Sequence, residues 1–212
     1  AAARDNGGPI AEGNPMPLRC LLVSDSPAAT SGYSNQIGQI GPTLKALGHD
    51  VAYLAAFGHH GQMTEYQGIP MYPGGLDGFG NDVIGPAAKD WRADVVITLK
   101  DLWVYRPQEW CAGIRWCPMV PVDHEPIAEG IVSMLRQHCY HPIAYSQFGQ
   151  QQLFNAGFAP SYAPHTFDPA ALNPMDKADA RKAIGMPDDV FAIGMVAVNR
   201  GAFLCKVLIN RT

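Results

Sequence analysis

The segment VPVDHEP, residues 120–126, holds the densest group of reactive side chains. Asp123, His124 and Glu125 are adjacent titratable residues, and Pro126 restricts the backbone directly after them. An imidazole can donate a hydrogen bond to a hydroxyl group or accept one from it, and a nearby carboxylate can fix its tautomer. The segment therefore suits a hydroxyl-bearing ligand at His124. The alternative is a structural histidine whose hydrogen bonds are satisfied within the protein.

A second candidate is the segment TLKDLWV, residues 98–104, in which Asp101 is followed two positions later by Trp103. Sugars present apolar ring faces and hydroxyl edges, so an aromatic ring beside a carboxylate suits a carbohydrate ligand. Packing of Trp103 in the core is the alternative interpretation.

A third candidate is the loop SDSPAATSGYSN, residues 24–35, which contains Gly32. Backbone N–H groups of such a loop can approach an anion where the loop opens a helix. The loop lacks the GxGxxG and GxxxxGK[ST] patterns, so it predicts no dinucleotide or Walker-type phosphate site. An ordinary turn built from small residues is the alternative.

Metal-ligand and thiol residue types are present but dispersed. The pair His59–His60 and the segment HCYH, residues 138–141, have no partner group at zinc-site spacing, so we expect no metal site. The five cysteines include no CxxC pair, which argues against a disulfide framework.

Short apolar strands that alternate with helical patterns must position these residues. Such alternation is typical of βαβ units, so we expect an α/β fold with a doubly wound, mostly parallel, Rossmann-like sheet. Ser146 is predicted to cap a helix that ends at Gly157. Loops after parallel strands meet at one edge, which should bring His124 and the 26–34 loop to one crevice. The predicted strands cover residues 18–24, 50–56, 68–72, 94–99, 117–122, 142–145 and 161–166.

This Rossmann-like domain is expected to cover residues 17–168. Residues 1–16 show no periodicity and are interpreted as a leader outside the fold. Residues 169–189 are a proline-rich linker with a short helix, and residues 190–212 begin a further α/β domain. An apolar strand over 190–198 would be exposed there and would invite self-association.

Composition limits the classes of partner. The 212 residues include 15 Lys+Arg and 19 Asp+Glu, giving a net charge of −4, whereas sequence-independent nucleic-acid binding needs clustered cations. No apolar run approaches the ~20 residues that span a bilayer. The N-terminal residues contain no apolar stretch of the signal-peptide type. We therefore expect a cytoplasmic protein with no transmembrane segment and no nucleic-acid partner.

In their order along the chain, these segments resemble the N-terminal half of retaining glycosyltransferases of the GT-B fold, the group 1 family. LLVSDSPAATSGYSNQ and LKALGHDVAYL match the family's opening strand, glycine-containing loop and helix. VDHEP stands where the family often has a histidine at the acceptor and donor-sugar site. AYSQFGQQQLFNAGF and YAPHTFD look like the run into the interdomain linker. ARKAIGMPDDVFAIGMVAVNRG is similar to the entry into the nucleotide-binding domain.

The resemblance implies sugar transfer with retention, from a nucleotide-sugar donor to a hydroxyl acceptor, without a cofactor or a metal. It places Ser31 and Gly32 near the donor diphosphate. Arg200 matches a basic residue that pairs with the diphosphate. Lys206 would be its companion, although AFLCKVLINRT departs from the family's pattern at that point.

The resemblance also assigns a role in the VDHEP segment: His124 would be the catalytic residue and contact the reacting sugar or the acceptor. From the chemistry of the two segments, we expect Asp101, Asp123 and Glu125 to bind substrate. The family's Glu-x7-Glu segment, which holds the donor sugar and ribose, belongs to the second domain and is absent from these residues.

The chain is therefore expected to be a form truncated at the start of the second domain, and inactive by itself. Two alternative hypotheses, each for a different class of protein, remain open. One is a non-catalytic sugar- or nucleotide-binding module, and the other is a degenerate structural fragment of the same fold.

Overall fold

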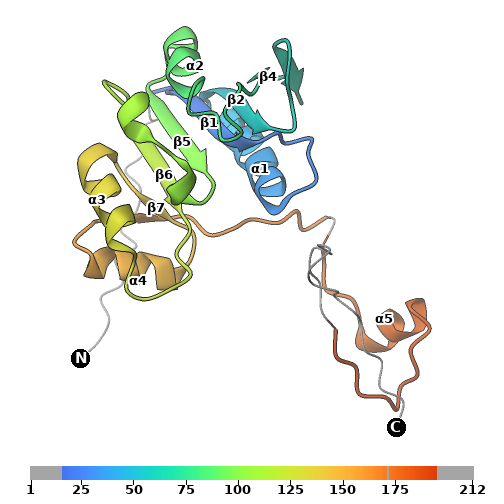
Figure 1. The fold of residues 1–212 in the computed structure, drawn as a ribbon. Coiled ribbons are helices and arrows are strands. Elements are labelled where there is room, and N and C mark those ends of the chain that lie inside the picture. Colours follow the sequence, from blue (N-terminus) through green and yellow to red (C-terminus); the bar gives the residue numbers. More distant parts are fainter. Residues whose placement is uncertain (1–15, 171, 195–212) are drawn as a thin grey trace. The chain divides into compact units, whose positions relative to one another are not determined.

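The computed structural model describes residues 16–170 and 172–194, which fall into two units divided between Phe167 and Asp168. Each unit is described by itself. The first unit contains a sheet of short strands, covered by helices that follow them (Figure 1). Its strands are β1 (Arg19–Asp25), β2 (Asp50–Phe57), β3 (Thr64–Tyr66), β4 (Ile69–Tyr72), β5 (Val95–Leu99), β6 (Trp116–Val120), β7 (Ile143–Ala144) and β8 (Ser161–Tyr162). Its helices are α1 (Gly32–Ala46), α2 (Ile84–Trp91), α3 (Glu129–His138) and α4 (Gln147–Asn155), with 3-10 turns η1 (Leu102–Val104) and η2 (Pro107–Glu109).

The sheet has the strand order β3-β4-β2-β1-β5-β6-β7-β8, and every neighbouring pair is parallel except β3 with β4. The prediction of a doubly wound, mostly parallel α/β sheet is confirmed. From β1 the chain first adds strands on one side, through β2, and later on the other, through β5. The loops after β1 and β5 therefore flank the topological switch point, where open α/β sheets bind ligands.

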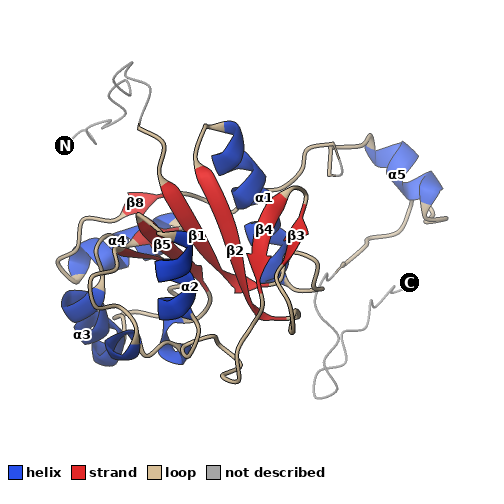
Figure 2. Ribbon diagram, turned by 90° about the horizontal axis from the view of Figure 1, so that it is seen from above, coloured by secondary structure: helices blue, strands red, loops and turns tan. Residues whose placement is uncertain are grey.

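Helices lie on both sides of the sheet (Figure 2), and apolar side chains pack between them and the central strands. Leu22 of β1 packs with Ile37 of α1 on one face of the sheet. Leu21 and Val23 alternate with it and pack with Ile84 of α2 on the opposite face. Because β1 is buried on both faces, its central residues form a continuous apolar run and do not alternate with polar residues.

A hairpin at one edge of the sheet was not predicted. β3 and β4 are joined by Gln67 and Gly68, both with positive φ (51° and 69°), which is the backbone of a two-residue hairpin turn. The strand predicted over 68–72 forms as β4, and Pro70 lies within it opposite Glu65.

Two helices of the first unit start at serine caps. Ser31 caps α1 by accepting a hydrogen bond from the Ser34 amide, and Ser146 caps α4 by accepting one from the Gly149 amide, as predicted for that serine. α1 thus begins at Gly32, and it continues through Pro42.

In the second unit, α5 (Lys177–Ala183) is capped by Asp176. The strand predicted over 190–198 is wrong for residues 190–194, which form no strand, and its remaining residues lie outside the described part. A connection rather than a strand follows α5, with the Arg181 side chain donating a hydrogen bond to the Val190 carbonyl over 3.0 Å. Among the described residues, no helix is long and apolar enough to cross a membrane.

Candidate functional site

A pocket of about 330 Å³ lies at the carboxyl ends of β5, β6 and β7. Two of the sequence-predicted segments, residues 98–104 and 120–126, supply most of its lining. They meet because β5 and β6 are adjacent parallel strands and each segment follows the end of its strand. The lining residues are Asp101, Leu102, Trp103, Pro121, Val122, Asp123, His124, Ile127, Ile131 and Tyr145.

His124 forms a close pair with its neighbour Asp123. The distance from His124 Nδ1 to Asp123 Oδ1 is 2.5 Å, and both side chains are largely exposed. The hydrogen bond from His124, aided by its charge when protonated, holds the pKa of Asp123 below its usual range. Because Nδ1 is engaged, Nε2 is the ring nitrogen left to bind a ligand hydroxyl.

Asp101 connects the pocket to the N-terminal end of α1. The Tyr33 hydroxyl donates a hydrogen bond to Asp101 Oδ1 over 3.0 Å. Burial, together with the charge of Asp101 and this hydrogen bond, raises the pKa of Tyr33 to about 12. The start of α1 and the Asp123–His124 segment thus lie at the same edge of the sheet.

The two residues assigned to the diphosphate lie at the start of α1. Ser31 donates a hydrogen bond to Asp25 Oδ2 over 2.7 Å, and its oxygen also accepts from the Ser34 amide. Its hydroxyl is therefore already used to hold the loop. Gly32 is exposed, and a Cβ at that position would meet no atom within 4 Å. Open space of this kind leaves the first backbone amides of α1 accessible to an anion.

Sequence reasoning missed an ion pair beside these residues. Lys100 Nζ lies 2.6 Å from Asp25 Oδ1, and both side chains are nearly buried. The ammonium group is surrounded by the rings of Tyr33, Phe57 and Phe79, at 5.6–5.9 Å from their centroids. The position of Lys100 directly after a predicted strand was the available signal.

The remaining sequence candidates are not brought into this pocket. Glu125 is exposed and does not line it. Arg200 and Lys206 lie outside the described residues.

Trp103 does line the pocket, and the alternative of core packing is wrong because 71% of this residue is exposed.

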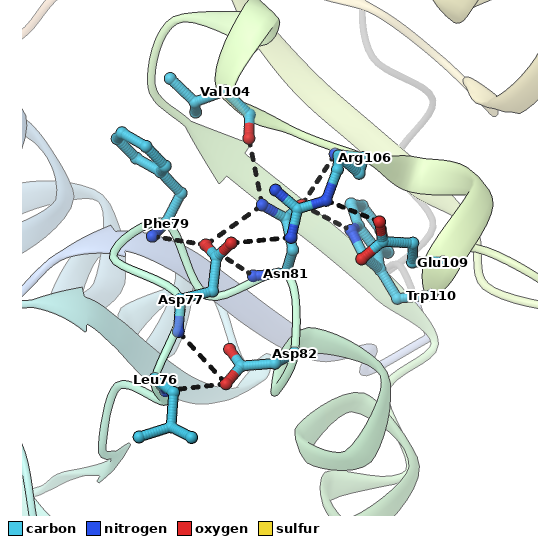
Figure 3. A network of polar contacts seen from close by, with 9 residues as sticks. All are labelled: Leu76, Asp77, Phe79, Asn81, Asp82, Val104, Arg106, Glu109 and Trp110. Atoms are coloured by element: carbon cyan, nitrogen blue, oxygen red, sulfur yellow. Dashed lines mark hydrogen bonds and ion pairs between the residues drawn. The ribbon is translucent and has the colours of Figure 1, made fainter.

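A polar network joins the loop after β4 to the segment after β5 (Figure 3). Asn81 is buried and forms its centre, donating to Asp77 Oδ1 and to the Val104 carbonyl and accepting from the Arg106 amide and Trp110 Nε1. All four hydrogen-bonding positions of its side-chain amide are filled. Arg106 adds ion pairs with Asp77 and Glu109.

Cysteine and metal chemistry find little support in the described residues. Burial raises the pKa of the Cys117 thiol to about 11 and that of Cys139 to about 12, so both remain protonated thiols near neutral pH. Among residues 16–170 and 172–194, no group of three or more His, Cys, Asp and Glu side chains is placed to hold a metal ion.

Comparison with known proteins gives one informative result. No protein-family model and no curated protein matches the sequence. Among solved structures, the chain is similar to a glycosyltransferase from Rickettsia africae ESF-5, with a TM-score of 0.53 and 16% identity. The alignment covers 82% of this chain and 51% of that one, so the chain spans about half the length of its neighbour. At this identity the similarity establishes a shared Rossmann-like α/β fold.

Proposed function

We propose that the first unit is the acceptor-side, N-terminal domain of a retaining GT-B glycosyltransferase, which moves a sugar from a nucleotide-sugar to a hydroxyl acceptor. The observation that carries the proposal is the convergence of Asp101, Asp123 and His124 on one pocket beside the switch point of the sheet. The shared fold with a structure described as a glycosyltransferase supports it.

In this proposal the pocket and the start of α1 take different parts of the reaction. His124 Nε2 contacts the reacting sugar or the acceptor hydroxyl, with Asp123 fixing the imidazole. The amides at Gly32 and the N-terminus of α1 face the donor diphosphate, since helix N-termini favour anions. Lys100 is already paired with Asp25. The cations that stabilise the leaving diphosphate would therefore come from Arg200 and Lys206, which the resemblance assigns to that task.

The contact sites can be tested by recording amide NMR spectra of the 212-residue chain during addition of nucleotide-sugars. We expect shifts at Ser31, Gly32 and His124 with a nucleotide-sugar, and none at Gly32 with the matching nucleoside, which lacks the diphosphate. Shifts confined to other parts of the sheet would contradict the proposal.

We also expect this chain by itself to transfer no sugar at a useful rate. Alignment of reactants is worth ~7–11 kcal/mol in well-ordered sites, and a domain that holds one side of the donor forfeits much of it. Nucleotide release from a panel of nucleotide-sugars measures this, with a complete two-domain glycosyltransferase as the positive control. Steady turnover by the isolated chain would show that the proposed division between two domains is wrong.

A further inference from the structure

Trp103 is the most conspicuous side chain at the pocket that the proposed reaction does not use. Tryptophan is highly buried on average, and Trp110 and Trp116 of this chain are buried in the core. Trp103 is instead 71% exposed while it lines the pocket beside Asp101. Its exposed area is a large apolar surface in the same pocket as the carboxylates of Asp101 and Asp123.

The backbone under Trp103 is fixed rather than free. Trp103 belongs to the turn η1, whose last residue, Val104, accepts a hydrogen bond from Asn81 over 3.0 Å (Figure 3). Two residues later, the Arg106 amide donates to the same Asn81 side chain over 2.7 Å. The Phe79 ring also meets the Trp103 ring edge to face, at 6.5 Å between centroids. A ring held in this way loses little conformational entropy when a ligand binds to it.

The charges of the pocket select against an anion. The charged or titratable side chains that line it are Asp101, Asp123, His124 and Tyr145, and no Lys or Arg is among the lining residues. Lys100 lies nearby but is held by Asp25. Carboxylates accept hydrogen bonds from hydroxyl groups and repel phosphates. The polar wall therefore suits a neutral ligand rich in hydroxyl groups.

We propose that this pocket binds a neutral pyranose ring, with the ring's apolar face on the indole of Trp103 and its hydroxyl groups on Asp101 and Asp123. Naming this sugar as the acceptor rests on the proposed function. The pocket's volume of about 330 Å³ is at the lower end of the ~300–1,000 Å³ typical of small-molecule sites, which suits a small ligand. In this proposal the acceptor is a carbohydrate, and Trp103 is the residue that determines specificity for it.

The test is titration of the 212-residue chain with neutral methyl pyranosides and disaccharides, following the indole N–H signal of Trp103 by NMR. We expect this signal to shift with a subset of the saccharides and to stay in place with inorganic pyrophosphate. Trp103→Ala should weaken saccharide binding about tenfold, the scale of an aromatic contact plus lost burial, and Trp103→Phe should retain most of the affinity. Tyr140→Ala removes another largely exposed aromatic, which does not line the pocket, and should change nothing.

Three results would overturn the proposal: no saccharide shifts the Trp103 signal, Trp103→Ala binds as the unchanged chain does, or pyrophosphate shifts the signal more than the sugars. Equal melting temperatures of the variants exclude unfolding as the cause of lost binding. If nucleotide-sugars still shift Gly32 while saccharides fail, the carbohydrate acceptor is wrong and the proposed function stands. If saccharides bind at Trp103 but no nucleotide-sugar changes the spectrum, the saccharide site is correct and the proposed donor site is wrong. The first unit would then be a sugar-binding module.

Discussion

Gly32 opens α1 at a place where a side chain would touch nothing, so packing does not require a glycine there. Gly32→Ala should leave the melting temperature unchanged or raise it, because glycine-to-alanine changes at compatible sites stabilise by about 0.4–1 kcal/mol. If the diphosphate approaches this amide, the added methyl group should weaken nucleotide-sugar binding. Thermal unfolding and the amide titration measure the two effects separately.

Gly130 provides the matched control for that variant. It lies in α3, and a Cβ there would also meet no atom within 4 Å. Gly130→Ala should have the same small effect on stability and none on binding. If both alanine variants bind nucleotide-sugars equally, Gly32 has no part in the donor site.

Asp77 makes the stability of the network in Figure 3 depend on pH. Burial alone would raise its pKa, but hydrogen bonds from Arg106, the Phe79 amide and Asn81 outweigh burial and lower it. A lowered pKa in the folded state stabilises the protein fully above the ordinary value of about 4, and this contribution is lost as the pH falls through the folded value. Urea unfolding between pH 2 and 7 gives the free energy of unfolding of the unchanged chain and of Asp77→Asn at each pH. At the acid end, this free energy should fall less steeply with decreasing pH in the variant. An identical pH dependence in the two proteins would contradict this role.

Residues adjacent in sequence were the part of the site that could be predicted. Asp123 and His124 form their pair because they are neighbours on one loop. Tyr33 and Asp101 are 68 residues apart, and their hydrogen bond exists because β1 and β5 are paired in register. A single sequence does not indicate which residues of β1 and β5 are paired. This contact and the Lys100–Asp25 pair could therefore not be predicted from it.

At the scale of elements, α1 and β2 approach each other through a glycine. A Cβ at Gly41 of α1 would overlap the hydroxyl of Tyr53 in β2, and that hydroxyl is buried with no hydrogen-bond partner among the described residues. Gly41→Ala should therefore lower the free energy of unfolding by about 1–3 kcal/mol, as overpacking does.

Tyr53→Phe tests the cause of that loss. Removal of an unsatisfied buried hydroxyl should be neutral or stabilising by itself. Because Cζ and Cε1 of the ring would still lie 2.5 and 2.9 Å from the added Cβ, it should recover only part of the stability of Gly41→Ala in the double variant. Denaturant unfolding of the four proteins gives the coupling between the two positions. Strictly additive effects would show that the hydroxyl is not what the alanine meets.

A serine before a helix predicted the cap at Ser146, and periodicity predicted the parallel strands well, because a capping side chain and burial on both faces are local signals. It missed β3, since three residues carry too little pattern to mark a strand. It also could not decide between the core and the surface for Trp103. That choice depends on the polar network of Asn81, whose partners come from two different loops.

At the scale of the whole molecule, the chain divides into two units, and it spans about half of its structural neighbour. The Rossmann-like fold of the first unit was predictable because the alternation of strands and helices extends through most of the chain. The domain boundaries expected at residues 168 and 189, and the further domain expected from residue 190, stay predictions. The second unit offers one short described helix and no described strand on which to judge them.

The central place of β1 has a consequence for synthesis on the ribosome. One edge of β1 pairs with β2, which follows soon in the chain, but the other pairs with β5; Ser24 and its partner Leu99 are 75 residues apart. At roughly 5–20 residues per second, translation takes about 4–15 s to supply that distance. During this interval one edge of β1, whose central residues Cys20–Val23 are apolar, has no neighbour, which is the kind of surface that chaperones and other nascent chains bind. The order of strands in the folded sheet thus determines how long the edge of β1 stays unpaired during translation and open to aggregation.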